Sequence, residues 1–400
     1  MKPALILLTV LLCSAAPVHA GTISVEAGEN AQERLQTALI DAKPGDTVAI
    51  GAGRFDLTDG LSLDVPNVTV RGAGATQTIL NFKGQKGAGE GLLLTGDDVV
   101  VRDLSVEDTR GDGIKSKGVK RAVFANLRVV WTGGAKSTNG AYGVYPVATV
   151  GVLIDNVYVS GASDAGIYVG QSQNIIVRNS TAIGNVAGIE IENSFDADVY
   201  SNVSMHNTGG ILIFDLPDLP QKGGRNIRIF SNRVEKNDTA NFAPPGNIVA
   251  SVPVGTGIMV MANRNVHVYA NAVGENATAN VFVVAYKNAF TDAGYNPRVK
   301  DIVIRDNIHG RAGWAPGFVG GKELSAAMGG TIAPIFWDGV GGAAAGVHVF
   351  DKVPVLTLGL AEPTSKISEA KPSLIDLSTT PAPPMPPAVV LPASMEAAIK

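Results

Sequence analysis

Short alternating segments of hydrophobic and polar residues, separated by Gly, Asn and Asp, run through most of this chain. One clear unit, Gln173–Asn193, reads as a strand, a corner Asn, a short strand, a Gly corner and a third strand. Alternation with a period of two predicts β-strands that each bury one face. Because similar units follow one another at a spacing of about 23 residues, with insertions, the pattern predicts a β-solenoid and not a globular α/β domain.

An Asn or Asp residue recurs once per unit and sets the register of the repeat. Identical amides stacked about 4.8 Å apart can hydrogen-bond to the coils above and below, since each carries donors and acceptors. We therefore interpret this ladder as an internal structural spine and not as a row of catalytic groups. Its expected members are Asp103, Asn126, Asn156, Asn179, Asn202, Asn232, Asn271 and Asn307.

A second column consists of a Gly followed by Ile or Val. Glycine at each corner permits a sharp or left-handed bend. The branched residue after it is predicted to point inward and to stack along the solenoid axis. These inward residues are Ile114, Val144, Ile167, Ile189, Ile211 and Ile258.

The ends of the solenoid differ from its middle. We expect residues 21–310 to form the β-helix, opened by one capping helix with Asn30 as its N-cap and Glu33 completing a capping box. Residues 311–360 are predicted to form an irregular C-terminal cap. Residues 361–400 are a Pro-rich tail, which either packs along the solenoid or stays mobile.

Long insertions fall at only two kinds of corner. Residues 131–140 and 236–255 follow the Asn corner, whereas residues 215–224 and 286–298 follow the strand after the Gly corner. Loops on a rigid scaffold often carry binding sites. The insertions are therefore predicted to flank the Gly-corner strands and to wall a groove there.

Composition and the N-terminus restrict location and partners. A formal net charge of −4 gives no reason to expect nucleic acid or an anionic membrane as a partner. Residues 1–20 have the charged start, apolar stretch and Val18-His19-Ala20 cleavage site of a signal peptide, too short to span a bilayer. We expect a soluble periplasmic or secreted protein. Its one cysteine, Cys13, lies in the signal, so the mature chain is expected to lack disulfides.

The repeats resemble the right-handed parallel β-helix units of exported bacterial proteins. The resemblance rests on Asn-containing strands followed by Gly-Ile-x-Ile, as in Gly188–Ser194, and covers roughly residues 45–310. The same repeat type occurs in polysaccharide lyases, alginate C5-epimerases and the copper-maturation protein of nitrous oxide reductase. The chain lacks the Gly-His-Gly, Asn-Thr-Asp and Asp-Pro-His-Asp motifs of the polygalacturonases and periplasmic epimerases, so no catalytic residue is transferred from them.

The residues that follow the inward column should face outward and form a graded surface. Aromatic rings in adjacent coils offer flat apolar faces that suit sugar rings, although such rings also pack under loops. Lysines beside them can neutralise the carboxylate of an acidic sugar. The two outward rows read Lys115, Tyr145, Tyr168, Glu190, Leu212 and Met259, and then Lys117, Val147, Gly170, Glu192, Phe214 and Met261.

Glu190 and Glu192 lie two residues apart on one strand face, with Asp215 predicted to be near them in the next coil. Like charges this close should raise at least one pKa. The trio can act as acid and base together with Lys115, or it can bind Ca²⁺ through its oxygen atoms. The competing interpretation is that these charges are solubilising surface ion pairs. The scattered histidines have no metal-ligand spacing, so a zinc or copper site is not expected.

Two functions follow from this surface. One is a polysaccharide lyase or C5-epimerase acting on acidic glycans, with Glu190, Glu192, Asp215 and Lys115 as catalytic groups and Lys117, Tyr145 and Tyr168 binding substrate. The other is a non-catalytic scaffold that binds a glycan or another exported protein. An open groove along this column favours the enzyme, whereas burial of the column under loops or the tail favours the scaffold.

Overall fold

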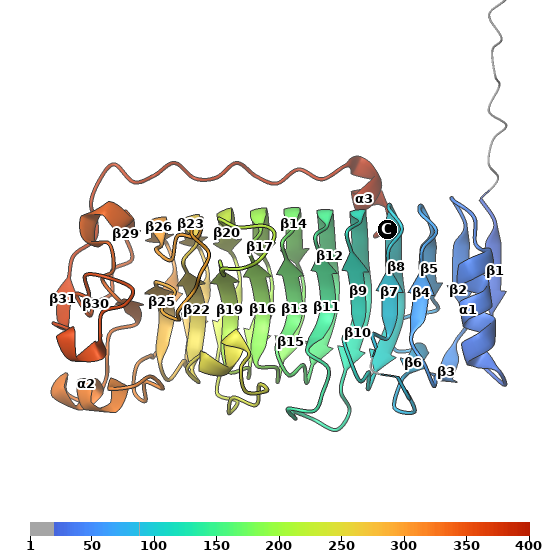
Figure 1. Ribbon diagram of the computed structural model, residues 1–400, viewed down its shortest axis with the longest axis horizontal. Helices are drawn as coiled ribbons and strands as arrows, with labels where there is room; N and C mark the ends of the chain where they lie inside the picture. The colour runs from blue at the N-terminus through green and yellow to red at the C-terminus, as the bar shows by residue number, and fades with distance from the viewer. Residues whose placement is uncertain (1–19, 88) are drawn as a thin grey trace, which may run out of the picture.

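The chain coils into a parallel β-helix in a computed structural model that describes residues 20–87 and 89–400 (Figure 1). The predicted signal peptide lies almost wholly outside the described residues. The strands form one twelve-stranded and one nineteen-stranded sheet, and every pairing between named strands is parallel except that of β30 with β31. The predicted fold class is therefore confirmed. In the described part of the chain, no helix is long and apolar enough to cross a membrane.

Each regular coil supplies one strand to the twelve-stranded sheet and its other strands to the nineteen-stranded sheet. The twelve-stranded sheet contains β4 (Leu61–Leu63), β7 (Leu92–Leu94), β9 (Ile114–Lys117), β11 (Tyr142–Val147), β13 (Ala165–Gly170), β16 (Ala187–Glu192), β19 (Gly209–Phe214), β22 (Thr256–Met261), β25 (Ala279–Val284), β28 (Ile335–Trp337), β30 (Val355–Thr357) and β31 (Ser373–Ile375).

The nineteen-stranded sheet covers the remaining sides of the coils. It contains β1 (Thr22–Val25), β2 (Thr47–Ile50), β3 (Gly53–Asp56), β5 (Thr69–Gly72), β6 (Thr78–Asn81), β8 (Val99–Glu107), β10 (Lys120–Val130), β12 (Val150–Ser160), β14 (Gln173–Arg178), β15 (Thr181–Ile183), β17 (Phe195–Tyr200), β18 (Val203–Met205), β20 (Arg225–Phe230), β21 (Arg233–Glu235), β23 (Arg264–Tyr269), β24 (Ala272–Gly274), β26 (Lys300–Arg305), β27 (Ile308–His309) and β29 (Val347–Val349).

The inward column after the Gly corners is confirmed. Its six members are paired in register from coil to coil, and all six are fully buried. Each glycine is also required by close packing. A Cβ on Gly188, for example, would lie 2.6 Å from the backbone oxygen of Gly210, so a larger residue would push adjacent coils apart.

The predicted Asn ladder was wrong in one respect, because it joins two different columns. Asn179 pairs in register with Ser201, so Asn202 is one position off. Asp103, Asn126, Asn156 and Asn179 occupy an outer column with left-handed backbone. The continuous spine is an inner column, in which each amide oxygen accepts from the backbone N–H of the preceding coil. Its members are Ser180, Asn202, Asn232, Asn271 and Asn307, closed by Asp351.

A second buried spine was not predicted. The side-chain oxygens of Asn207 and Asn237 accept from the backbone N–H of the preceding member, 3.0 and 3.3 Å away, in a column that runs from Asn185 to Asn276. Buried amides that are hydrogen-bonded on both sides fix the spacing of the coils. The structural interpretation of the Asn residues therefore holds for the inner column, and the outer Asn156 and Asn179 are exposed.

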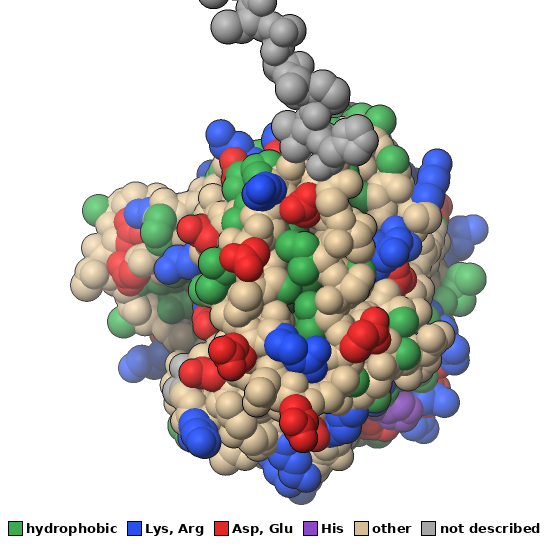
Figure 2. Space-filling view, turned by 90° about the vertical axis from the view of Figure 1, so that its right-hand side faces the viewer, with side chains coloured by type: hydrophobic (Ala, Val, Ile, Leu, Met, Phe, Trp, Pro, Cys, Tyr) green, Lys and Arg blue, Asp and Glu red, His purple; other side chains and the backbone are tan. Residues whose placement is uncertain are grey.

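A helix covers the N-terminal end of the solenoid, as predicted. Helix α1 (Ala31–Asp41) buries Ala31, Leu35, Ala38 and Leu39 against the first coil. Its predicted capping box is wrong, because Asn30 adopts a left-handed backbone conformation and its side chain makes no capping bond. Acidic and basic side chains are interspersed over this end (Figure 2). Two short helices lie further along, α2 (Gly321–Ala327) and α3 (Ala393–Ala397).

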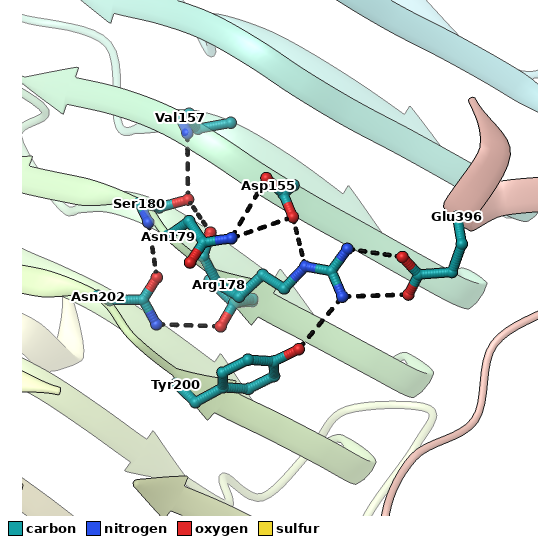
Figure 3. Close-up of polar contacts among 9 residues, drawn as sticks. Asp155, Val157, Arg178, Asn179, Ser180, Tyr200, Asn202 and Glu396 are labelled. Atoms are coloured by element: carbon teal, nitrogen blue, oxygen red, sulfur yellow. Dashed lines mark hydrogen bonds and ion pairs between the residues drawn. The ribbon is translucent and has the colours of Figure 1, made fainter. Parts of the chain in front are cut away.

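The Pro-rich tail runs back along the solenoid to α3, which lies near β8 (Figure 1). Leu391 and Met395 pack on Val123, Leu153 and Ile176 of the nineteen-stranded sheet. Figure 3 shows the anchoring ion pair, in which the two terminal nitrogens of the Arg178 guanidinium, Nη2 and Nη1, donate to Glu396 at 2.6 and 3.1 Å. Of the two alternatives for the tail, the structure therefore has it packed along the solenoid.

Candidate functional site

The outward rows on the twelve-stranded sheet have the register that the sequence predicts. Lys115 pairs with Tyr145, Tyr168 with Glu190, and Glu190 with Leu212. The second row runs through Gly170, Glu192 and Phe214. Strand alternation therefore brings the candidate residues onto one face, and what these residues can do chemically depends on what covers that face.

Lys115 is already neutralised by its surroundings. Its Nζ lies 2.9 Å from Glu90 and 3.1 Å from Asp112, and 4.6 Å from the centre of the Tyr145 ring. Because two carboxylates already pair with this lysine, the three groups together carry no net positive charge that would attract the carboxylate of an acidic sugar. Lys117, one row away, is exposed.

Three tyrosines meet beside this lysine. The ring centre of Tyr142 lies 4.5 Å from that of Tyr145 and 4.4 Å from that of Tyr168. Tyr142 and Tyr145 are partly exposed, whereas Tyr168 is buried. The outward rows did not include Tyr142, because it occupies the position before the Gly corner. In the sequence, only its spacing of three residues from Tyr145 points to Tyr142.

A cluster of three buried carboxyl groups lies next to these rings. Asp164, Glu190 and Glu192 expose 4%, 1% and 7% of their surface. The Tyr168 hydroxyl donates to Glu192 Oε1 at 2.6 Å, and the Tyr142 hydroxyl lies 3.4 Å from Asp164 Oδ2. Glu190 Oε2 is buried and has no hydrogen-bond partner within the described residues.

Burial changes the protonation of this cluster. Loss of solvent raises the pKa of Asp164 to about 7, and the nearby Glu192 charge adds to the effect. Burial likewise raises the pKa of Glu192 to about 7. The pKa of Glu190 is raised well above its usual range by burial and then by Asp164. The three groups therefore retain protons at a pH where exposed carboxyl groups are ionised.

Asp215 lies near this cluster, as the sequence suggested, because its charge helps to raise the pKa of Glu192. Its carboxylate accepts from the backbone N–H groups of Gly223 and Gly224 at 3.1 and 2.8 Å, which closes the loop 215–224 on itself. The third carboxyl group of the cluster is Asp164, from the corner before β13. In residues 20–87 and 89–400, no group of three or more His, Cys, Asp or Glu side chains is arranged to hold a metal.

Loops cover the middle and C-terminal part of this face. Val249 and Val252 of the loop 236–255 belong to one buried apolar cluster with Leu212 and Phe214. Asn247 of the same loop donates to Asp164 Oδ2 at 3.2 Å. Tyr295 of the loop 286–298 donates to the backbone oxygen of Asp215. The predicted insertions therefore lie where the sequence placed them, but they close over the column and do not wall an open groove.

Beyond these loops, an apolar cavity of about 340 Å³ lies over the C-terminal strands of the sheet. Met259, Met261, Phe282 and Val284 contribute from β22 and β25, with Phe318 from the C-terminal cap. Strand alternation predicted the outward direction of the two methionines, but no local pattern predicted the cap residues that line the cavity with them. The lining is mostly hydrophobic and contains one lysine, Lys287.

Comparisons with known proteins agree with this architecture. A model of the right-handed β-helix region matches residues 90–243. This match agrees with the parallel β-helix of the structure, and the chain is structurally similar to alginate epimerases, alginate lyases and polygalacturonases. No curated protein matches the chain in sequence.

Three solved structures illustrate this similarity. The A-module of a mannuronan C-5 epimerase from Azotobacter vinelandii is 16% identical, with a TM-score of 0.47, over 71% of this chain and 85% of that one. An alginate lyase from Paenibacillus is 18% identical, with a TM-score of 0.46, over 73% and 98%. A family 28 exopolygalacturonase from Yersinia enterocolitica is 14% identical, with a TM-score of 0.47, over 82% and 71%. At these values, the similarity is one of fold alone.

Proposed function

We propose that this protein is an exported scaffold that binds a polysaccharide chain, with Tyr142 and Tyr145 as the contact surface. The observation that carries the proposal is the pair of partly exposed, touching tyrosine rings on a rigid sheet, with the exposed Lys117 on the neighbouring strand β9. Tyrosine rings present an apolar face to the C–H side of a sugar and a hydroxyl to its polar edge. The N-terminal sequence supports a periplasmic or secreted location.

The charge around the rings supports a neutral or weakly acidic sugar at this point. Lys115 is paired with Glu90 and Asp112. Lys117 is therefore the exposed lysine of the two outward rows. The burial of Glu190 and Glu192 under loops favours the scaffold over the acidic-glycan enzyme. Burial removes both carboxyl groups from direct contact with a substrate on the surface.

Binding to a panel of neutral and uronic acid oligosaccharides, measured by calorimetry, tests this proposal. Tyr145→Ala should weaken binding at least tenfold, a loss of about 1.4 kcal/mol. Tyr158→Ala is the matched control, since Tyr158 is exposed on the other sheet. If no oligosaccharide binds, or if both substitutions have the same effect, the proposed platform is wrong.

A second function, acid–base processing of the glycan, is supported by one observation. The carboxyl groups of Asp164 and Glu192 have pKa values raised to about 7, and values near the working pH suit general acid–base catalysis. The partly exposed Tyr142, 3.4 Å from Asp164, is the group through which such a proton would reach a substrate.

A screen of polyuronides for unsaturated or epimerised products decides between the two functions. The enzyme predicts turnover that Tyr142→Phe, Asp164→Asn and Glu190→Gln each reduce at least a hundredfold. The scaffold predicts no turnover of any polyuronide and binding that Glu190→Gln leaves unchanged.

A further inference from the structure

A second cavity lies at a corner between the two sheets, away from the tyrosines. It measures about 390 Å³ and is bounded by residues of the loops 215–224 and 286–298. Lys222, Arg225, Arg264 and Asn296 are among its lining residues. Both arginines are the first residues of their strands, β20 and β23, so the rigid sheet holds their backbones.

Three cations are stacked in register at this corner. Arg225 pairs with Arg264, and Arg264 pairs with Lys300 of the next coil. Neighbouring strands lie about 4.8 Å apart, and like charges directly opposite each other are destabilising. The Arg225 guanidinium lies 3.8 Å from the centre of the Phe195 ring, which positions it without neutralising it.

The cations lack the carboxylate partners that such a stack would require. Within residues 20–87 and 89–400, Arg225, Arg264 and Lys300 have no Asp or Glu oxygen within 4.0 Å, and Lys222 alone is paired, with Asp292. The Arg264 Nε is buried and makes no hydrogen bond in that part of the chain. Asp215, the nearby acid, is already bound by the N–H groups of Gly223 and Gly224.

We propose that Arg225 and Arg264 bind an oxyanion, a carboxylate or a phosphate group carried on a larger ligand, with Lys300 extending the site along the axis. A guanidinium presents parallel N–H donors that match a carboxylate or phosphate, and a bound anion relieves the repulsion between stacked cations. The site uses neither the tyrosine pair nor the buried carboxyl cluster, so it goes beyond the proposed glycan platform.

Calorimetry at low salt tests this site in the full chain, with inorganic phosphate and a uronic acid tetramer as separate probes. We expect at least one probe to bind and its affinity to fall as salt is added. Arg225→Gln and Arg264→Gln should each weaken binding at least tenfold, and Lys300→Gln about threefold. Tighter binding of the tetramer identifies a carboxylate ligand, whereas tighter binding of phosphate identifies a phosphate ligand.

Arg233→Gln is the matched control, because Arg233 is exposed on β21 and already paired with Glu235. Circular dichroism checks that each variant is folded. If an arginine variant does not fold, Lys300→Gln still tests the site, because Lys300 is exposed and its replacement should not disturb the fold. Absence of binding by both probes at millimolar concentration, or equal affinity in site and control variants, overturns the proposal. Tyr145→Ala should leave this binding unchanged, which separates the site from the glycan platform.

Discussion

The two halves of one outward row on the twelve-stranded sheet have the same register and opposite surroundings. In the N-terminal half, Leu93, Lys115 and Tyr145 are partly exposed. In the C-terminal half, Glu190, Leu212 and Met259 are buried beneath residues of loops and cap. The position of a residue in the repeat therefore fixes whether its side chain points inward or outward. Whether an outward side chain is exposed to solvent depends on the length of the loops inserted at the neighbouring corners.

The covered half behaves as a second hydrophobic core outside the solenoid. Leu212 and Phe214 share it with Val249 and Val252 of one loop and with Tyr295 of another. This core seals the three carboxyl groups from water and produces their raised pKa values. Tyr142 and Tyr145 pack against the edge of this core and keep part of their surface exposed, so their rings remain available for contact with a ligand.

The sharpest test of this difference replaces the same residue type in the same row on each side. Leu212→Ala should lower the free energy of unfolding by about 3–5 kcal/mol, because it leaves a cavity in a packed environment. Leu93→Ala should cost about 1 kcal/mol, since water and nearby side chains can fill its place. Urea unfolding of both variants measures the difference. Equal losses would show that the loops do not cover Leu212 in solution.

The buried carboxyl groups should make stability depend on pH in a defined direction. Their folded pKa values of about 7 lie above the usual value near 4, so the folded state binds more protons between those limits. Stability should therefore be greatest at the acidic side of this window and fall by on the order of 2–3 kcal/mol as pH rises through 7. Urea unfolding at pH 5 and pH 8 measures the fall.

Glu192→Gln provides the control for that pH dependence. It removes one titrating group while keeping a side chain of the same size and an acceptor for Tyr168. The variant should lose a smaller part of its stability between pH 5 and pH 8 than the unmodified protein does. An unchanged pH dependence would mean that the cluster is ionised already at pH 5.

The smallest expected effect concerns the contact between the covering loop and the cluster. Asn247→Ala removes a donor to Asp164, and an unsatisfied buried acceptor costs about 1–2 kcal/mol. Faster hydrogen exchange in residues 247–252 would report the loosened loop. The exposed Asn288 offers a matched control, and Asn288→Ala should change neither quantity. If it had the same effect as Asn247→Ala, the contact with Asp164 would not be what holds the loop.

Several features could be predicted because they depend on local repetition. The inward Ile and Val column, the positions of the long loops and the outward direction of Glu190 and Glu192 follow from strand periodicity. The Asn ladder could be predicted only in part. A single-residue shift between Asn179 and Asn202 moves the amide from the outer to the inner column, and the similar spacing of the repeats hides that shift.

The candidate site could be predicted less well, because its partners come from distant segments. Asp164 meets Glu190 and Glu192 only through the stacking of coils, and Asn247 reaches it across 83 positions of sequence. Lys115 carries two carboxylate partners that a list of outward residues does not include. The stacked Arg225 and Arg264 are 39 positions apart, a separation set by an inserted loop and not by the basic repeat.

The β-helix follows from the sequence alone, because the backbone groups of period-two strands joined by glycine corners find hydrogen-bond partners only when each coil stacks on the next. It also determined which side chains point inward, because alternation in a strand is a local property of the backbone. The tertiary structure decided which outward residues meet water. Burial depends on loops and a C-terminal cap that fold back from other coils, and no local pattern encodes where they come to lie.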